Sequence, residues 1–145
     1  MLWERLGKHD NIVAYLDSEL QEIDDDVEML ILCELCQGGF TLIDMLEQCK
    51  GKIPEHVVLS IMSDLAAGVA HMHKLGMAHW DLKVENVLMG TDHKFKLADY
   101  GSAQDEQFFV KWEEKPNSKL LAHKFEYFER NTTMMYRAPE MIDQY

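Results

Sequence analysis

Four side chains whose chemistry could serve a group transfer lie close together in the sequence: Asp81, Lys83, Asn86 and Asp99. A carboxylate such as Asp81 can accept the proton of an attacking hydroxyl. Amide and carboxylate oxygens, as at Asn86 and Asp99, are ligands that Mg²⁺ prefers. An ammonium such as Lys83 can offset charge on phosphate oxygens. Each residue alone would be interpreted as a solvated loop residue, but together they indicate phosphoryl transfer, with Asp81 and Lys83 catalytic and Asn86 and Asp99 binding metal.

The order of three motifs supports this interpretation. They read His-Trp-Asp-Leu-Lys-Val-Glu-Asn at 79–86, Asp-Tyr-Gly at 99–101, and Thr-Thr-Met-Met-Tyr-Arg-Ala-Pro-Glu at 132–140. They resemble, in the same order, the catalytic loop, the metal-binding loop and the end of the activation segment of protein kinases. The resemblance assigns two threonines and the last glutamate to the activation segment, namely Thr132, Thr133 and Glu140.

Within the protein kinases, the sequence resembles the Numb-associated serine/threonine kinase family. The phrases that carry this resemblance are Asp-Leu-Lys-Val-Glu-Asn-Val-Leu at 81–88, Gly-Ser-Ala at 101–103, and Thr-Thr and Tyr-Arg-Ala-Pro-Glu-Met-Ile within 132–142. That family implies transfer of the ATP γ-phosphate to protein Ser or Thr hydroxyls, with Mg²⁺, and a link to endocytic traffic. Endocytic adaptor proteins are therefore implied partners. The alternative is a non-catalytic pseudokinase or interaction module.

The resemblance implies an α+β, protein-kinase-like fold that is partial. Its parts would be the last small-lobe strands at 1–33, the hinge at 34–40, and the first part of the mainly helical large lobe at 41–145, with the catalytic loop at 79–86 and the activation segment at 99–140.

The same resemblance implies a set of nucleotide contacts. Cys33 would be the gatekeeper, Glu34 and Cys36 would present hinge backbone groups to the adenine, and Leu88 would form the apolar floor beneath it. Lys83, Asn86 and Asp99 would complete the site around the phosphates and the metal.

Two residues depart from the kinase pattern. Trp80 replaces the Arg of His-Arg-Asp, which normally pairs with an activation-segment phosphate, and an indole cannot do this. Tyr100 replaces the Phe of Asp-Phe-Gly and adds one hydroxyl that needs a partner. Neither change removes a catalytic group, so we expect Trp80 to alter regulation more than transfer.

Local patterns predict the elements that position these residues. We expect a strand at 12–16, an acidic loop between Asp17 and Glu28, and a buried strand at 29–33. A short helix is expected at 42–48, and a long one should begin at Pro54 and end before Gly76. Its apolar stripe is Val58, Ile61, Met62, Leu65, Ala66, Val69 and Met72. Short strands are expected at 87–89 and 95–97.

Composition excludes several classes of protein. The formal net charge of −12 argues against nucleic acid as a partner. No apolar run reaches membrane-spanning length and no signal peptide is visible, so we expect a cytoplasmic protein. Cys33 and Cys36 form a C-x-x-C pair, but no second Cys or His pair stands at zinc-site spacing. A metal or redox role for this pair is therefore disfavoured.

Several kinase elements are not found in this sequence. No Gly-rich phosphate loop and no Val-Ala-Ile-Lys strand precede the hinge, and no further large-lobe helices follow the Ala-Pro-Glu motif. We therefore interpret the chain as a kinase fragment, either a partial gene model or a truncated product. Because positioning of the triphosphate depends on the small-lobe Lys and loop, we expect little activity from these 145 residues alone.

Overall fold

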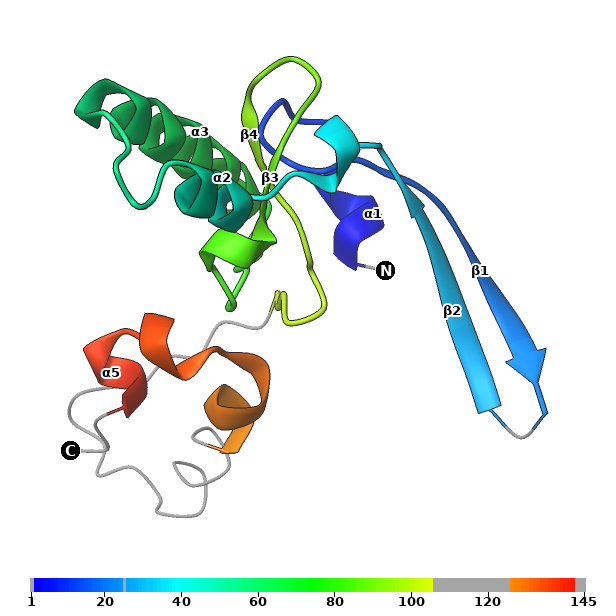
Figure 1. Ribbon diagram of the computed structural model, residues 1–145. Coiled ribbons are helices and arrows are strands. Elements are labelled where there is room, and N and C mark those ends of the chain that lie inside the picture. The colour runs from blue at the N-terminus through cyan, green and yellow to red at the C-terminus, as the bar shows by residue number, and fades with distance from the viewer. Residues whose placement is uncertain (1, 25, 106–125, 143–145) are drawn as a thin grey trace.

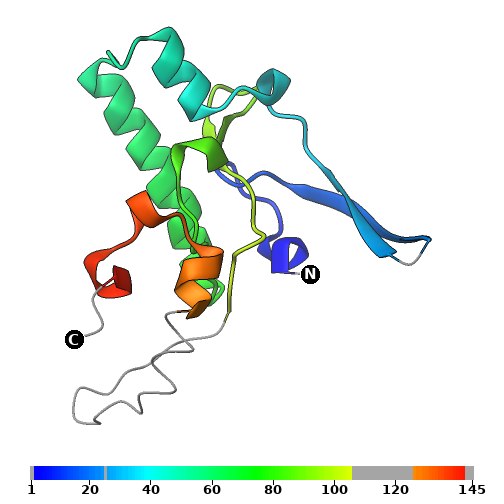
Figure 2. The same cartoon turned by 60° about the horizontal axis from the view of Figure 1, so that its bottom comes forward.

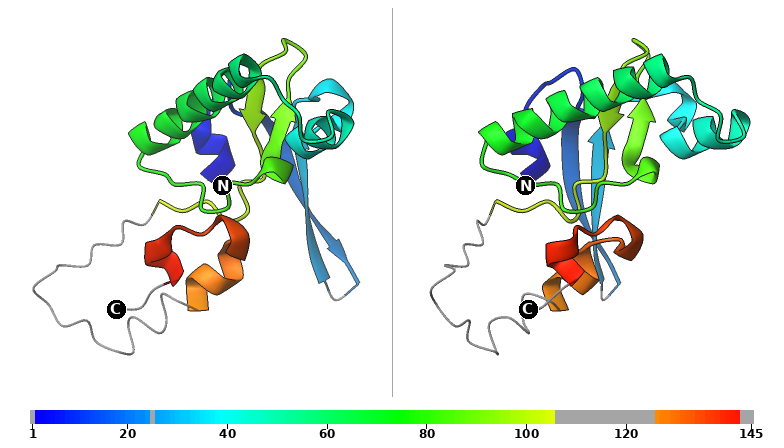
Figure 3. Two further views of the ribbon diagram at one scale, coloured as in Figure 1. Left: turned by 60° about the vertical axis from the view of Figure 1, so that its left-hand side comes forward. Right: turned by 90° about the vertical axis from the view of Figure 1, so that its left-hand side faces the viewer.

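The computed structural model describes residues 2–24, 26–105 and 126–142. Its centre is the long helix α3 (Glu55–Lys74), with a short strand pair and the N-terminal segment beside it (Figures 1 and 3). A two-stranded ribbon projects away from this centre, and residues 126–142 lie beside the loop that follows α3 (Figures 1 and 2). Helices and antiparallel strands together confirm the predicted α+β class.

The projecting ribbon consists of β1 (Tyr15–Ile23) and β2 (Asp26–Cys33), paired antiparallel. The predicted acidic loop between Asp17 and Glu28 is therefore wrong, because most of these residues belong to the two strands. Strand pairing satisfies the backbone groups that face the partner strand, while the exposed position of the ribbon leaves the carboxylates in water. Acidic composition alone consequently did not exclude a strand.

The apolar run 29–33 forms a strand as predicted, but the predicted burial is wrong. Leu30 is 48% exposed and Leu32 is 60% exposed. Within the described residues, β1 and β2 pair only with each other, so no third strand extends the ribbon. Burial of a strand depends on a layer packed against its face, which the strand's own sequence does not encode.

Two helices follow the ribbon. The 3₁₀ turn η1 (Gln37–Gly39) leads to α2 (Leu42–Gln48), whose bounds match the prediction. Thr41 and Asp44 form a capping box at its start: the Asp44 N–H donates to Thr41 Oγ1 and the Thr41 N–H donates to Asp44 Oδ2 at 2.8 Å. α3 has Pro54 as its N-cap residue and ends just before Gly76, whose φ of 73° is the left-handed conformation that glycine adopts easily.

The predicted apolar stripe of α3 is only partly buried. Ile61 and Met72 are 5% and 0% exposed, and Leu65 and Val69 are half-buried. The other members, Val58, Met62 and Ala66, are exposed, which corrects the prediction. The packed strip follows spacings of four, four and three residues. The elements that pack on α3 therefore cover only part of its apolar face.

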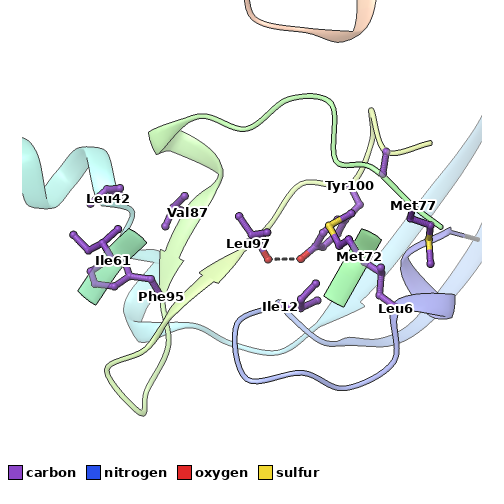
Figure 4. Packing of buried hydrophobic residues seen from close by; sticks show 11 residues of the cluster. Leu6, Ile12, Leu42, Ile61, Met72, Met77, Val87, Phe95, Leu97 and Tyr100 are labelled. Carbon is purple, nitrogen blue, oxygen red and sulfur yellow. Dashed lines mark hydrogen bonds between the residues drawn. The ribbon is translucent and has the colours of Figure 1, made fainter. Parts of the chain in front are cut away.

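The strands β3 (Val87–Met89) and β4 (Phe95–Leu97) pair antiparallel, as predicted. Their inner side chains join α2 and α3 in one core (Figure 4). The buried members of this core are Leu6, Ile12, Leu42, Ile61, Met72, Met77, Val87, Phe95, Leu97, Tyr100 and Ala103.

The N-terminal segment attaches to the outer side of β4. It begins with α1 (Leu2–Leu6) and continues through residues 7–13. The Val13 N–H donates to Leu97 O at 2.9 Å, and the Leu97 N–H donates to Asn11 O at 3.0 Å. Asn11 Nδ2 also donates to Phe95 O. The segment therefore fixes the strand that leads into Asp99.

The remaining described elements are short: η2 (Val84–Asn86), the helical residues 126–131, η3 (Met134–Tyr136) and α5 (Pro139–Ile142). Within the described residues, no helix has both the length and the apolar character needed to span a membrane.

At Gly68, α3 lies close against the N-terminal segment and β4. A Cβ built at this residue would lie 2.7 Å from Asn11 O and 3.1 Å from Leu97 Cδ1. We predict that Gly68→Ala destabilises the chain by about 1–2 kcal/mol, because overpacking costs up to about 3 kcal/mol and the higher helix propensity of Ala offsets only roughly 1 kcal/mol of it. Urea denaturation measures the change.

The matched control for this prediction is Ala67→Gly at the neighbouring exposed position of α3. Propensity alone governs that site, so the control should lose about 1 kcal/mol. A Gly68→Ala variant as stable as the parent chain, or more stable, would show that the helix does not approach Asn11 as closely as described.

Candidate active site

The carboxylate of Asp81 is the meeting point of two distant segments. Thr133 donates to Asp81 Oδ1 from both its backbone N–H, at 2.8 Å, and its hydroxyl, at 2.7 Å. Lys83 Nζ lies 2.7 Å from Asp81 Oδ2 and donates to the Thr133 hydroxyl at 3.2 Å. Asp81, Lys83 and Thr133 therefore form one polar unit between the catalytic loop and the activation segment.

This polar unit keeps Asp81 charged. Burial would raise the pKa of the Asp81 carboxyl, but the hydrogen bonds from Lys83 and Thr133 outweigh it and hold the pKa below its ordinary value. The hydrogen bond to Asp81 in turn raises the pKa of Lys83. The pair is thus an ionised carboxylate beside an ammonium at neutral pH, which is the state that proton acceptance and phosphate binding require.

Asn86 is buried and its orientation is fixed from both ends. Its Nδ2 donates to the backbone oxygen of Asp81 at 2.9 Å, and its own backbone oxygen accepts from the Ala98 N–H at 2.9 Å. The first bond uses the amide nitrogen, which leaves Oδ1 as the available ligand atom. The second bond brings Asn86 beside the residue that precedes Asp99.

Asp99 lies at the end of β4 in a strained backbone conformation. Its φ is 60°, in the left-handed region, and its side chain is exposed with the Gly101 N–H donating to Oδ1 at 3.3 Å. His79 Nε2 holds the preceding residue through a 3.0 Å hydrogen bond to Ala98 O, and burial lowers the pKa of His79, so the imidazole is neutral. Such strain persists where surrounding contacts fix the backbone, as they do here.

The oxygen atoms of Asn86 and Asp99 fit a hard cation. They are an amide and a carboxylate oxygen on adjacent segments, and Mg²⁺ is usually bound by one or two carboxylates together with substrate phosphates and water. Asp99 also lines a cavity of about 510 Å³. Its other walls come from α1, β2 and residues 100–104, namely Leu2, Trp3, Met29, Ile31, Tyr100, Gly101, Ala103 and Gln104.

The four residues predicted to contact adenine do not line that cavity. Cys33 ends β2, Cys36 is buried before η1, and Leu88 is half-buried on β3, opposite Lys96. All three cysteines are free thiols, and burial raises the pKa of Cys36. The adenine contacts of these residues stay predictions.

Glu34 has a role that the sequence did not reveal. Its Oε1 lies 2.8 Å from Lys96 Nζ, and its Oε2 accepts from the Ala14 N–H at 2.9 Å. Lys96 is itself buried although it stands between two apolar residues of β4. This ion pair ties the predicted hinge to the strand before Asp99. No local pattern identifies it, because the two residues are distant in the sequence.

The structure describes the predicted activation segment, residues 99–140, at 99–105 and from residue 126 onward. Thr132 accepts from Arg137 Nε at 2.7 Å through its hydroxyl, and Thr133 binds Asp81 as above. The assignment of both threonines to the activation segment stays a prediction, and the side chain of Glu140 lies outside what is described. Arg137 was not a predicted site residue. It also donates to the carbonyl oxygens of Glu129 and Thr132.

A second cavity, of about 210 Å³, lies directly beside Asp81. It is lined by the catalytic loop and by the segment that leads into α5: Trp80, Asp81, Leu82, Thr132, Thr133, Tyr136, Arg137, Ala138 and Met141. Its position next to an ionised carboxylate suits the approach of a hydroxyl-bearing chain.

Comparison with known proteins identifies the same domain. The protein kinase domain family matches residues 2–145. The chain is 36% identical over 150 residues to a probable serine/threonine-protein kinase of Dictyostelium discoideum, covering 99% of this chain. It is 34% identical over 141 residues to actin-regulating kinase 1 of Saccharomyces cerevisiae and 36% over 140 residues to the serine/threonine-protein kinase AKL1 of the same yeast, covering 92% and 93% of this chain.

The chain spans only a small part of these relatives: 13%, 21% and 12% of their respective lengths. The predicted resemblance to serine/threonine kinases is confirmed, and the yeast relatives include members of the actin-regulating and Numb-associated group.

The bonds to Asp81 predict a change in its titration. Thr133→Val removes one donor, so the pKa of the Asp81 carboxyl should rise toward its ordinary value of 3.8. A depressed folded-state pKa stabilises the fold above the unfolded-state pKa, and this contribution disappears as pH falls through the folded-state value. The variant should therefore lose it at a higher pH than the parent chain.

Carboxyl ¹³C NMR of the chain, titrated from neutral to acid pH, measures this change. Thr91→Val, at an exposed turn between β3 and β4, is the matched control and should leave Asp81 unaltered. An Asp81 titration that is the same in parent and Thr133→Val would show that the threonine does not hold the carboxylate.

Proposed function

This chain belongs to the protein kinase domain family, and from that premise we propose that the protein transfers the γ-phosphate of ATP to Ser or Thr hydroxyls of other proteins. The observation that carries the proposal is the ionised Asp81 carboxylate, held by Lys83 and Thr133 beside a cavity. The serine/threonine kinases among its relatives support the proposal.

In this proposal Asp81 accepts the proton of the attacking hydroxyl. A carboxylate offers about four lone-pair sites, and the bonds from Thr133 and Lys83 use three of them. One site thus stays open to a substrate hydroxyl at the cavity. Those bonds also fix the direction in which the carboxylate points, which positions the nucleophile for in-line attack.

Lys83 has two roles in this scheme. Its ammonium lies 2.7 Å from Asp81 and so stabilises the ionised base. Asp81 and Thr133 use two of its three N–H donors, and the third can offset charge on the oxygens of the transferred group. Lys83 is half-buried, so water screens this charge less than it would at an exposed site.

We propose that Asn86 and Asp99 hold Mg²⁺ on the ATP phosphates. When bound, the ion neutralises negative charge on the phosphate oxygens. Asn86 contributes Oδ1, and Asp99 contributes a carboxylate held at the end of β4. Cys33, Glu34, Cys36 and Leu88 remain the proposed adenine contacts.

Partners and location are proposed on family grounds. One relative is named actin-regulating kinase 1, and the sequence resembles kinases of endocytic traffic. We therefore propose protein substrates that include endocytic adaptors, and a cytoplasmic site of action. The net charge of −12 supports a protein rather than a nucleic acid partner.

One observation favours a second candidate, a non-catalytic interaction module. Trp80 stands immediately before Asp81 and packs on aromatic residues of the activation segment. A module of this kind would keep the fold and the partners without transferring phosphate. Measurement of phosphoryl transfer decides between the two.

We predict that Asp81→Asn in the natural protein lowers kcat for peptide phosphorylation by about 100- to 10,000-fold, since it removes the proton acceptor. Transfer from radiolabelled ATP measures the rate. Glu85→Gln, an exposed carboxylate in η2, is the matched control and should keep at least half of the parent rate. Asp81→Asn activity within tenfold of the parent would remove Asp81 from the catalytic role.

A separate prediction concerns the metal. Asp99→Asn should raise the Mg²⁺ concentration at half-maximal rate by about tenfold or more. Mutation of a residue that merely supports a metal ligand already lowers metal affinity by at least about tenfold, and loss of the ligand itself should cost no less. Asp92→Asn, in the exposed turn before β4, is the control and should not change it. An unaltered Mg²⁺ requirement in Asp99→Asn would argue against Asp99 as a ligand.

A further inference from the structure

Trp80 connects the catalytic loop to the activation segment through ring contacts. Its indole stacks on Phe128, with ring centroids 5.0 Å apart and planes 25° from parallel. It also meets Tyr127 edge-on, at 5.5 Å and 89°. All three side chains are half-buried. These are the two arrangements that aromatic pairs prefer, and each stabilises beyond simple burial.

The backbone at Trp80 is held in a conformation that a tryptophan seldom adopts. Its φ is 70°, in the left-handed region. A residue keeps such a conformation only where its surroundings fix it. The stacking on Phe128 and Tyr127, together with the bonds at the next residue, Asp81, supplies that fixation.

A short series of hydrogen-bonded residues connects the aromatic contacts to Asp81. Residues 126–131 are helical, and the Thr132 hydroxyl donates to Phe128 O while Asn131 Nδ2 donates to Tyr127 O. The next residue, Thr133, donates to Asp81. An interaction that fixes the position of Phe128 therefore also keeps Thr133 within hydrogen-bond distance of the Asp81 carboxylate.

We propose that Trp80 is a positioning residue: its ring, packed on Phe128 and Tyr127, holds residues 126–133 so that Thr133 stays on Asp81, and it does so without a phosphate group. Only the expected effect of this docking on the rate of phosphoryl transfer rests on the proposed kinase function. The docking itself is a property of the described contacts.

The charges around this aromatic cluster of Trp80, Tyr127 and Phe128 agree with docking that is independent of phosphate. An indole offers one N–H donor and no charge, so it is a poor partner for a phosphate dianion. Three cations lie in or beside residues 126–133. Arg130 pairs with Glu126, and Lys83 pairs with Asp81. Arg137 donates to the Thr132 hydroxyl and to the carbonyl oxygens of Glu129 and Thr132. Backbone and hydroxyl groups of the segment thus take three of the five N–H donors of the guanidinium.

Hydrogen exchange of the natural protein, read by mass spectrometry, tests the docking directly. Trp80→Ala should speed exchange of amides 126–133 by about tenfold, because two aromatic pairs are lost, while α3 amides keep their parent rates. Trp80→Phe keeps a ring to stack on Phe128 and should stay within about threefold of the parent. Phosphatase treatment of the parent protein should leave exchange of 126–133 unaltered.

A second variant guards against misfolding of Trp80→Ala. Phe128→Ala removes the same contact from the segment side and should speed exchange of 126–133 alike, whereas the double variant should add less than about twofold more. Met135→Ala is the matched control, since that apolar side chain is 82% exposed on the same segment.

Two results would overturn the proposal. One is parent-like exchange of 126–133 in Phe128→Ala. The other is a loss of protection on phosphatase treatment as large as that in Phe128→Ala, which would assign the docking to a phosphate, for example on Thr132 beside Arg137. If the parent protein transfers no phosphate, the proposed function fails while these exchange results still decide the docking.

Discussion

The hydrogen bonds that converge on the Asp81 carboxylate are the interaction on which the rest of the site depends. They join a loop fixed by the core to a segment that returns about fifty residues later, with Thr133 and Lys83 as the other members. Burial alone would raise the pKa of this carboxyl, whereas the bonds from Lys83 and Thr133 lower it. The same bonds that hold the activation segment therefore also keep the base in its working state.

The core serves this junction by fixing the two ends of the catalytic loop. Leu97 is fully buried between α3 and the N-terminal segment, and its backbone pairs with residues 11 and 13. The next residue, Ala98, accepts a hydrogen bond from His79 Nε2 and donates its N–H to Asn86 O. These bonds attach His79 and Asn86 to the residue that follows the buried Leu97, which limits the freedom of both side chains before any substrate arrives.

Local sequence patterns predicted several secondary-structure elements correctly. The bounds of β3, β4 and α2 followed from local apolar patterns and turn residues, and the motif around Asp81 indicated the site. Burial could not be predicted, because it depends on partners distant in sequence: Leu32 and Met62 are exposed although their patterns are apolar. The Glu34–Lys96 pair and the stacking of Trp80 on Phe128 were missed for the same reason, since each joins separate segments.

The most direct test of the central claim, that Asp81, Lys83 and Thr133 act as one unit, is a double-mutant cycle on Lys83→Met and Thr133→Val. The reading is kcat for phosphoryl transfer by the natural protein. If both residues act through the carboxylate of Asp81, the double variant should lose less than the product of the single losses, with a coupling of about 0.5–3 kcal/mol. Losses that multiply, with coupling below about 0.3 kcal/mol, would contradict the account.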